Sequence, residues 1–194
     1  MARSRIPLST VALVVALISG AARSAPVSAQ DSPRCVVGEL TRASTPGPFF
    51  KAGSPERASL LDADVSGRRL LLSGSVLDST CAAIPGARVD FWQADAAGSY
   101  DLRGYRLRGH QFTDADGRYS LETIVPAEYT GRTSHLHVTV TPPGGAPFTT
   151  QLYFPGVDRN ATDFLFDAGL LMQAEPQGED ILGRFDFVVR GVGG

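Results

Sequence analysis

Two histidines separated by one residue are the strongest chemical signal in this sequence. His135 and His137 are two of the three histidines in the chain. Alternate residues of a β-strand point to the same face, so on a strand both imidazoles can reach one metal ion. The competing interpretation is a pair of polar residues on the solvent face of an edge strand. Two histidines do not complete a metal site, so the metal interpretation requires further ligands.

Oxygen ligands are available from two residue types. A carboxylate from Asp95 or Asp101 would complete a site of two histidines and one acid. The other type is tyrosine, because Tyr100 and Tyr129 lie in expected loops, where functional residues concentrate. A free tyrosine ionises at about pH 10, so a phenolate at neutral pH requires a strong positive charge, such as a trivalent iron ion. Each tyrosine could instead be a rim aromatic with a hydrogen-bonded hydroxyl.

Short β-type segments must position these residues. Apolar or alternating runs, separated by Gly, Pro and Asp turns, are expected to form strands. They cover residues 69–77, 87–92, 118–124, 135–141, 148–154 and 184–189, with one more strand before the turn at 114–117. Only residues 163–173 have a pattern that suggests a helix. Many short strands at this spacing predict an all-β fold, either a sandwich or a small barrel.

The N-terminal residues have the three-part pattern of a secretory signal peptide. Arg3 and Arg5 precede an apolar run at 11–22, and small residues at 27–29 suit cleavage. The run is short for a bilayer span, and no other segment is long and apolar enough to cross a membrane. We therefore expect residues 1–29 to be removed. The mature protein would then be exported, to the periplasm or the extracellular medium, without a membrane anchor.

The two cysteines, Cys35 and Cys81, are expected to form a disulfide. Export places them in an oxidising environment, and an even number favours pairing. The bond would attach an irregular N-terminal arm, residues 30–66, to the domain formed by residues 67–194. Pro and Gly residues in the arm break any helix or strand period. The alternative is a pair of buried free thiols.

Composition and charge exclude several classes of protein. The chain has 194 residues, of which 43% are hydrophobic and 20% charged, and these values are typical of a folded domain. Its 18 basic and 20 acidic residues give a formal net charge of -2. The sequence therefore has no electrostatic basis for a nucleic acid partner.

Residues 84–154 resemble the catalytic core of the intradiol ring-cleavage dioxygenases, non-haem ferric enzymes that open catechols. The motifs that carry the resemblance are Pro85-Gly86-Ala87, Val89 to Ala94, Gly98-Ser99-Tyr100, Thr113 to Tyr119, Thr123 to Tyr129, Arg132 to His137 and Thr150 to Phe154. Upstream, Cys35 and residues 45–50 resemble the arm of the family's exported members. Each motif alone is weak, whereas the ordered set is specific. The resemblance implies a single β-sandwich of the prealbumin (transthyretin-like) type.

The resemblance also implies a site and a reaction. The ligands of one non-haem Fe(III) would be Tyr100, Tyr129, His135 and His137. Two phenolates and a hydroxide would balance the three charges of the ion, while the imidazoles donate without charge. A catecholic substrate would displace the hydroxide and Tyr129, and reaction with O2 would give a cis,cis-muconate-type diacid.

Two further residues match positions in the family's active site. Arg132 would stabilise negative charge that develops on the ring. Gln151 would orient the substrate or the oxygen. The alternatives are a surface ion pair for Arg132 and an ordinary strand position for Gln151.

Departures from the family pattern leave other interpretations open. The connection at 101–112 is short, and residues 130–131 are Thr and Gly where relatives often place an aromatic, so the catechol is not identified. Tyr105 could replace Tyr100 as a ligand, and His110 lies close enough in sequence to be considered.

A second class of function stays open beside the enzyme. An exported prealbumin-like module could bind carbohydrate or protein without catalysis, and a degenerate family member could bind iron or catechol without turnover. The chain has no room for the helical segment through which catechol and hydroxyquinol enzymes dimerise, so the oligomeric state is not predicted.

Overall fold

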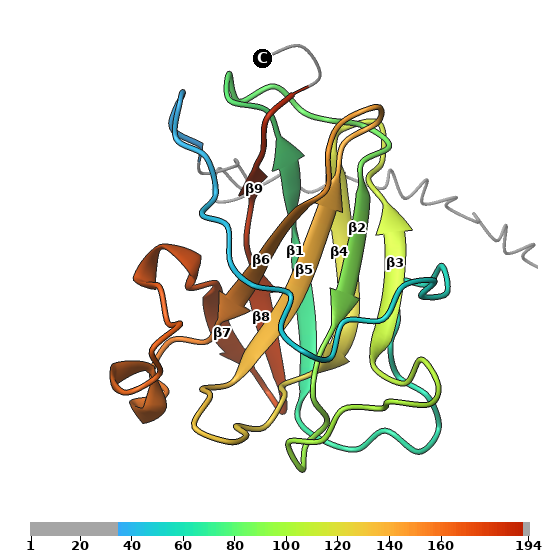
Figure 1. Cartoon of the computed structure of the whole chain (residues 1–194), viewed down its shortest axis with the longest axis vertical. Helices are drawn as coiled ribbons and strands as arrows, with labels where there is room; N and C mark the ends of the chain where they lie inside the picture. The colour runs from blue at the N-terminus through green and yellow to red at the C-terminus, as the bar shows by residue number, and fades with distance from the viewer. Residues whose placement is uncertain (1–34, 192–194) are drawn as a thin grey trace, which may run out of the picture. The chain divides into compact units, whose positions relative to one another are not determined.

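The computed structural model describes residues 35–191, so the expected signal peptide and residues 30–34 of the arm lie outside it. Figure 1 shows two β-sheets, which share one apolar core. The first sheet has the order β4 (Arg118–Ile124), β1 (Arg69–Leu77), β8 (Asp180–Arg184) and β7 (Gln173–Gln177), with β9 (Phe187–Val188) beside the end of β1. The second has the order β3 (Arg108–Phe112), β2 (Arg88–Trp92), β5 (His135–Thr141) and β6 (Phe148–Tyr153). This architecture confirms the predicted all-β sandwich.

Alternating burial explains how the first sheet faces the core. In β4, Tyr119 and Leu121 are buried, whereas Arg118 and Ser120 are exposed. β4 pairs antiparallel with β1, and β1 pairs parallel with β8. The buried side chains of these strands join one hydrophobic cluster with those of the second sheet. Burial of this apolar surface is the main favourable term in folding.

Strand β5 is the strand that positions the histidines. It lies inside its sheet, antiparallel to β2 on one side and to β6 on the other. Leu136, Val138 and Val140 are fully buried in the core. His135 and His137 alternate with them, so both imidazoles lie on the opposite face of the strand. Because β5 is an interior strand, the alternative that the two histidines lie on the solvent face of an edge strand is wrong.

The N-terminal arm passes in front of the second sheet (Figure 1). Its backbone is bonded at both ends, because the amide of Ser44 donates to the carbonyl of Thr149, and that of Arg57 to the carbonyl of His110. A disulfide joins Cys35 to Cys81, as predicted. The arm therefore covers the face of the sheet on which the histidines lie.

The predicted helix at 163–173 is wrong. The connection from β6 to β7 contains only two short 3-10 turns, η2 (Asp158–Ala161) and η3 (Ala168–Leu170), and β7 begins at Gln173. In this segment the carboxylate of Asp163 accepts a hydrogen bond from Arg132, 31 residues away in sequence, and does not cap a helix N-terminus. Strands β7 and β8 were not predicted, and the expected strand at 184–189 is split between the end of β8 and β9.

Within residues 35–191, no helix is long and apolar enough to span a membrane.

Removal of the disulfide should destabilise the protein through the arm. The bond closes a loop with a sequence separation of 46 residues. Loop entropy predicts that the double variant Cys35→Ser/Cys81→Ser loses about 4 kcal/mol of unfolding free energy. Urea denaturation of the oxidised wild type and the double variant measures the difference. Equal unfolding midpoints would show that the arm is held by its backbone hydrogen bonds alone.

Candidate metal centre

The two imidazoles of β5 point their Nε2 atoms at each other. His135 and His137 are 2% and 0% exposed, and their Nε2 atoms lie 3.3 Å apart. The Nδ1 of His135 lies 2.6 Å from the carbonyl oxygen of Thr133. Because a carbonyl oxygen only accepts, this Nδ1 carries the proton and the Nε2 of His135 presents a lone pair.

Burial keeps both imidazoles neutral. It lowers the pKa of His135 to about 4. Burial, followed by the neighbouring His135, lowers the pKa of His137 well below its usual value. The neutral imidazole is the form that binds metals. Two facing Nε2 atoms need a shared proton or a metal ion between them, so the geometry provides half of a metal site.

Two tyrosines approach the histidine pair from separate loops. The hydroxyl of Tyr129 lies 3.4 Å from the Nε2 of His135. The ring of Tyr100 stands edge-on to that of Tyr129, with 5.4 Å between centroids, and lies 6.3 Å from the ring of His137. The structure thus brings together the four residues that the resemblance named as ligands.

A glycine allows the two tyrosine loops to meet. Gly98 has a φ of +76°, and a Cβ at this position would lie 2.7 Å from the carbonyl oxygen of Glu128 and 3.2 Å from the Cβ of Tyr129. A larger residue is excluded by both the backbone conformation and the contact. This close approach sets the distance between Tyr100 and Tyr129.

The hydroxyl of Tyr100 is buried and has no hydrogen-bond partner within the described part of the chain. Burial, and secondarily Tyr129, raise the pKa of Tyr100 well above its ordinary value, so the phenol stays neutral unless a cation binds it. An unpartnered buried hydroxyl is costly. Two neutral nitrogens and two phenol oxygens form a donor set that fits a hard trivalent ion such as Fe(III).

The other ligand candidates are engaged elsewhere. The carboxylate of Asp95 accepts two amides of its own turn and pairs with Arg106. The carboxylate of Asp101 accepts three amides of the loop that follows it. The hydroxyl of Tyr105 donates to a carbonyl of the arm, and the Nδ1 of His110 contacts another. None of these four residues is placed with the facing histidines.

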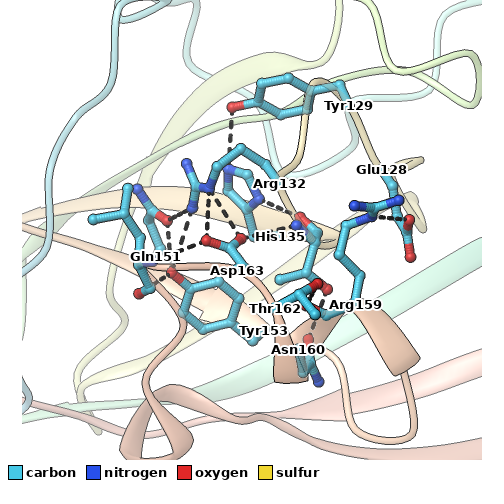
Figure 2. A network of polar contacts seen from close by, with 12 residues as sticks. Glu128, Tyr129, Arg132, His135, Gln151, Tyr153, Arg159, Asn160, Thr162 and Asp163 are labelled. Carbon is cyan, nitrogen blue, oxygen red and sulfur yellow. Dashed lines mark hydrogen bonds and ion pairs between the residues drawn. The ribbon is translucent and has the colours of Figure 1, made fainter.

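Beside the histidines, Arg132 is held in a buried polar network (Figure 2). Its Nε donates to both carboxylate oxygens of Asp163, at 2.9 and 3.1 Å. Its Nη2 donates to the Oε1 of Gln151 at 2.6 Å, and the hydroxyl of Tyr153 lies 2.8 Å from the same oxygen. Arg132 is therefore not a surface ion-pair residue, and Gln151 is not an ordinary strand residue.

Asp163 connects this network to the histidine strand. Its buried carboxylate also accepts the amide of Thr133 at 2.8 Å and that of Leu165 at 2.9 Å. Burial alone would raise the pKa of Asp163, but these amides and Arg132 outweigh burial and lower it. One ionised carboxylate thus fixes both the Arg132 guanidinium and the backbone two residues before His135.

The arm forms part of the site. A Cβ on Gly47, which has a φ of +65°, would lie 3.2 Å from the Cε1 of His137. Phe49 stacks on Tyr100, with 4.5 Å between ring centroids, and meets Tyr129 edge-on at 6.0 Å. These contacts place apolar surface against the tyrosines and limit their movement.

Sequence reasoning missed three residues of the site, namely Asp163, Phe49 and Trp92. The indole of Trp92 stacks in parallel on His137, with 5.0 Å between centroids. All three lie far from the histidines in sequence. Phe49 and Trp92 lie within motifs that carry the family resemblance, and this was the one sequence signal for their role in the site.

Comparisons with known proteins find dioxygenases. Residues 46–190 match the family model Dioxygenase_C, described as dioxygenase. The dioxygenase domain of a dioxygenase carbohydrate-binding protein fusion from Streptomyces sp. SirexAA-E is 49% identical, with a TM-score of 0.76, over 78% of this chain and 99% of that domain. The 3-chlorocatechol 1,2-dioxygenase of Rhodococcus opacus 1CP is 31% identical, with a TM-score of 0.73, over 79% of this chain and 73% of its own.

Curated relatives are longer than the matched region. The hydroxyquinol 1,2-dioxygenase of Nocardioides simplex is 31% identical over 66% of this chain and 52% of its own length. The chlorocatechol 1,2-dioxygenase of Pseudomonas sp. strain P51 is 30% identical over 78% of this chain and 72% of its own. The chain therefore spans about half the length of the hydroxyquinol enzyme that it matches.

Loss of the Asp163 charge should destabilise the fold. Asp163→Asn leaves the Arg132 guanidinium buried without its carboxylate, and breaking such a pair costs about 3–5 kcal/mol. Urea denaturation at neutral pH measures this loss. A matched control is Glu128→Gln, because Glu128 forms a solvent-exposed pair with Arg159 and should cost no more than about 1 kcal/mol.

The Asp163→Asn variant also tests how the stability of the protein depends on pH. Since the pKa of Asp163 is lowered in the folded protein, its stabilising contribution is complete above about pH 4 and is lost as the pH falls further. The stability difference between wild type and Asp163→Asn should shrink below that pH. A difference that stays constant down to low pH would contradict the ion pair.

Proposed function

We propose that this chain, which belongs to the family of intradiol ring-cleavage dioxygenases, opens a catecholic ring between its two hydroxyls with a non-haem ferric ion and dioxygen. The observation that carries this proposal is the convergence of two buried imidazole Nε2 atoms with the hydroxyl of Tyr129 and the side chain of Tyr100, whose buried hydroxyl has no partner among the described residues. The expected product is a cis,cis-muconate-type diacid. The catechol-cleaving activities that the names of several relatives state support the reaction class.

The four donors would leave one positive charge on the ferric ion, which a hydroxide or the substrate would balance. His135 and His137 supply neutral nitrogens, and Tyr100 and Tyr129 supply phenolate oxygens. A ferric ion held there would act as a Lewis acid and template and would make a catecholic substrate reactive toward dioxygen. The tyrosines favour the trivalent ion because phenolate is a hard anionic ligand.

Tyr129 is the proposed acceptor of a substrate proton. It lies on the loop that leads into β5, where Thr130 and Gly131 have φ values of +36° and +78° and make a sharp turn. Its hydroxyl is the one tyrosine oxygen of the site in contact with His135. A phenolate at Tyr129 would take a proton onto its Oη as a catechol hydroxyl ionises, so we assign it the role of general base.

We assign to Arg132 and Gln151 the role of binding and orienting the substrate. Asp163 fixes the Arg132 guanidinium through Nε, and Gln151 fixes it through Nη2. A guanidinium preorganised in this way stabilises negative charge that develops on the substrate without rearranging. The amide of Gln151 is in turn held by the carbonyl of Thr45 in the arm.

Export to the periplasm or the extracellular medium is part of the proposal. The disulfide between Cys35 and Cys81 supports it, since such bonds persist in oxidising compartments. The alternative function, an exported module that binds carbohydrate or protein without catalysis, is not favoured. Such a module has no need for two buried imidazoles and a buried, unpartnered phenol at one point.

Oxygen uptake with iron-loaded protein tests the reaction. The expected result with catechol, hydroxyquinol or a chlorocatechol is consumption of dioxygen and a ring-opened diacid that contains both oxygen atoms by mass spectrometry. Cleavage beside the hydroxyls, which gives an aldehyde product, would contradict the intradiol assignment. No uptake with any catechol would contradict the enzymatic one.

Variants of the donors connect this activity to the site. Tyr100→Phe, His135→Ala and His137→Ala should each weaken ferric binding by more than the roughly 10–100-fold that outer-shell changes cause. Tyr105→Phe is the matched control, because Tyr105 lies near Tyr100 in sequence but bonds to the arm. Full iron content and activity in all three donor variants would refute the assignment.

Arg132 should affect turnover without affecting iron. Arg132→Leu is expected to lower kcat by on the order of 100-fold while iron content stays at the wild-type level. The double variant Arg132→Leu/Asp163→Leu removes both buried charges and separates this effect from misfolding. Arg159→Leu, which changes an exposed arginine of the same region, is the control. Normal turnover in Arg132→Leu would remove this residue from the mechanism.

A further inference from the structure

Arg108 is a buried cation without an anion. It is the first residue of β3 and is 1% exposed. Its Nε and Nη2 donate to the carbonyl oxygen of Asp101 at 3.3 and 3.1 Å, and its Nη1 has no partner. Within residues 35–191, no carboxylate lies at ion-pair distance from it, although the other buried guanidinium, that of Arg132, has Asp163. Arginine stays charged in proteins, so the site has an uncompensated positive charge.

Tyr100 is a candidate for a counter-charge to Arg108. The Cζ of Arg108 lies over the ring of Tyr100, 5.8 Å from its centroid. The hydroxyl of Tyr100 is the buried oxygen without a partner described above. The guanidinium of Arg108 therefore lies over a ring whose buried oxygen has no partner, and a phenolate at Tyr100 would bring negative charge close to it.

The carboxylates around Arg108 are already used. Asp90 pairs with Arg88 and accepts the hydroxyl of Ser54. Asp101 offers Arg108 only its carbonyl, because its carboxylate accepts amides of the following loop. Lys51 is another cation of this region, and it points to the ring of Tyr105 and to backbone carbonyls. Among these described residues around Arg108, Tyr100 is the one whose side-chain oxygen has no hydrogen-bond partner.

We propose that Arg108 is a positioning residue for the metal centre, the counter-charge that sets the donor strength of a Tyr100 phenolate. This inference rests on the proposed function only in requiring that Tyr100 bind Fe(III). A cation beside the ring holds the phenolate electrons more tightly. The oxygen of Tyr100 then gives less charge to the ion, which stays a stronger Lewis acid for the substrate. The bonds from Arg108 to the carbonyl of Asp101 also fix the backbone next to Tyr100.

The two parts of this role, charge and hydrogen bonding, can be separated. Arg108→Gln keeps an N–H donor for the carbonyl of Asp101 but removes the charge. Arg108→Lys keeps the charge but loses the planar fork. A charge-transfer band from phenolate to Fe(III) reports the energy of the phenolate electrons directly. Removal of the cation raises that energy and moves the band to longer wavelength.

The test is the visible spectrum of the iron-loaded, substrate-free variants, with iron content and melting temperature measured alongside. Arg108→Gln should shift the band to longer wavelength by on the order of tens of nanometres, and Arg108→Lys should stay close to wild type. Arg88→Gln is the matched control, because Arg88 lies on the neighbouring strand and pairs with Asp90. This control should leave the band unchanged.

A second measurement does not depend on folding of an Arg108 variant. Tyr129→Phe leaves Tyr100 as the only phenolate of the site, and Tyr100→Phe leaves Tyr129. The band of Tyr129→Phe should lie at shorter wavelength than that of Tyr100→Phe, because Arg108 faces Tyr100. Coincident bands or the reverse order would overturn the assignment.

The outcomes distinguish this inference from the proposed function. An unshifted band in Arg108→Gln, or equal shifts in the Gln and Lys variants, would overturn the charge role and leave only support of the loop. A wild-type protein that binds no coloured iron would overturn it as well. A wild-type protein that shows the band and the predicted shifts but cleaves no catechol would refute the proposed function while supporting the role of Arg108.

Discussion

The site depends on one hydrogen bond, from the Nδ1 of His135 to the carbonyl oxygen of Thr133. It orients the imidazole and leaves the lone pair on Nε2, which faces the Nε2 of His137 at 3.3 Å. Both rings are buried, so water does not separate these atoms, and burial keeps both pKa values below their usual range. The arrangement is stable only with a proton or a metal ion between the two nitrogens, and the neighbouring phenols favour the metal.

The rest of the fold holds this geometry from several sides. The apolar residues of β5 lie in the sandwich core and set the direction of the two histidines. Asp163 binds both the amide of Thr133 and the guanidinium of Arg132, so the connection between β6 and β7 fixes the strand and the substrate-orienting residue together. The arm covers the opposite side through Gly47 and Phe49. The charge of Arg132 is paired with Asp163, whereas Arg108 has no carboxylate partner among the described residues and lies over the ring of Tyr100.

Local pattern predicted the parts of the site that depend on strand geometry. The spacing of His135 and His137 placed them on one face, and loop positions identified Tyr100 and Tyr129 as candidates. Local pattern failed where a long-range contact decides the structure. Asp163 lies in a segment that was expected to be helical, and its partner is 31 residues away. Strands β7 and β8 were missed because QAEPQ and DILGR carry little β-type signal and form only by pairing with each other and with β1.

The most direct test of the central claim is the iron content and visible absorption of the purified mature protein. We expect one ferric ion per chain and an intense visible band from tyrosinate bound to Fe(III), which shifts when a catechol is added without oxygen. A protein that stays colourless after loading with ferric iron would contradict it. The facing histidines and the two tyrosines would then be a buried polar cluster, bridged by a proton instead of a metal.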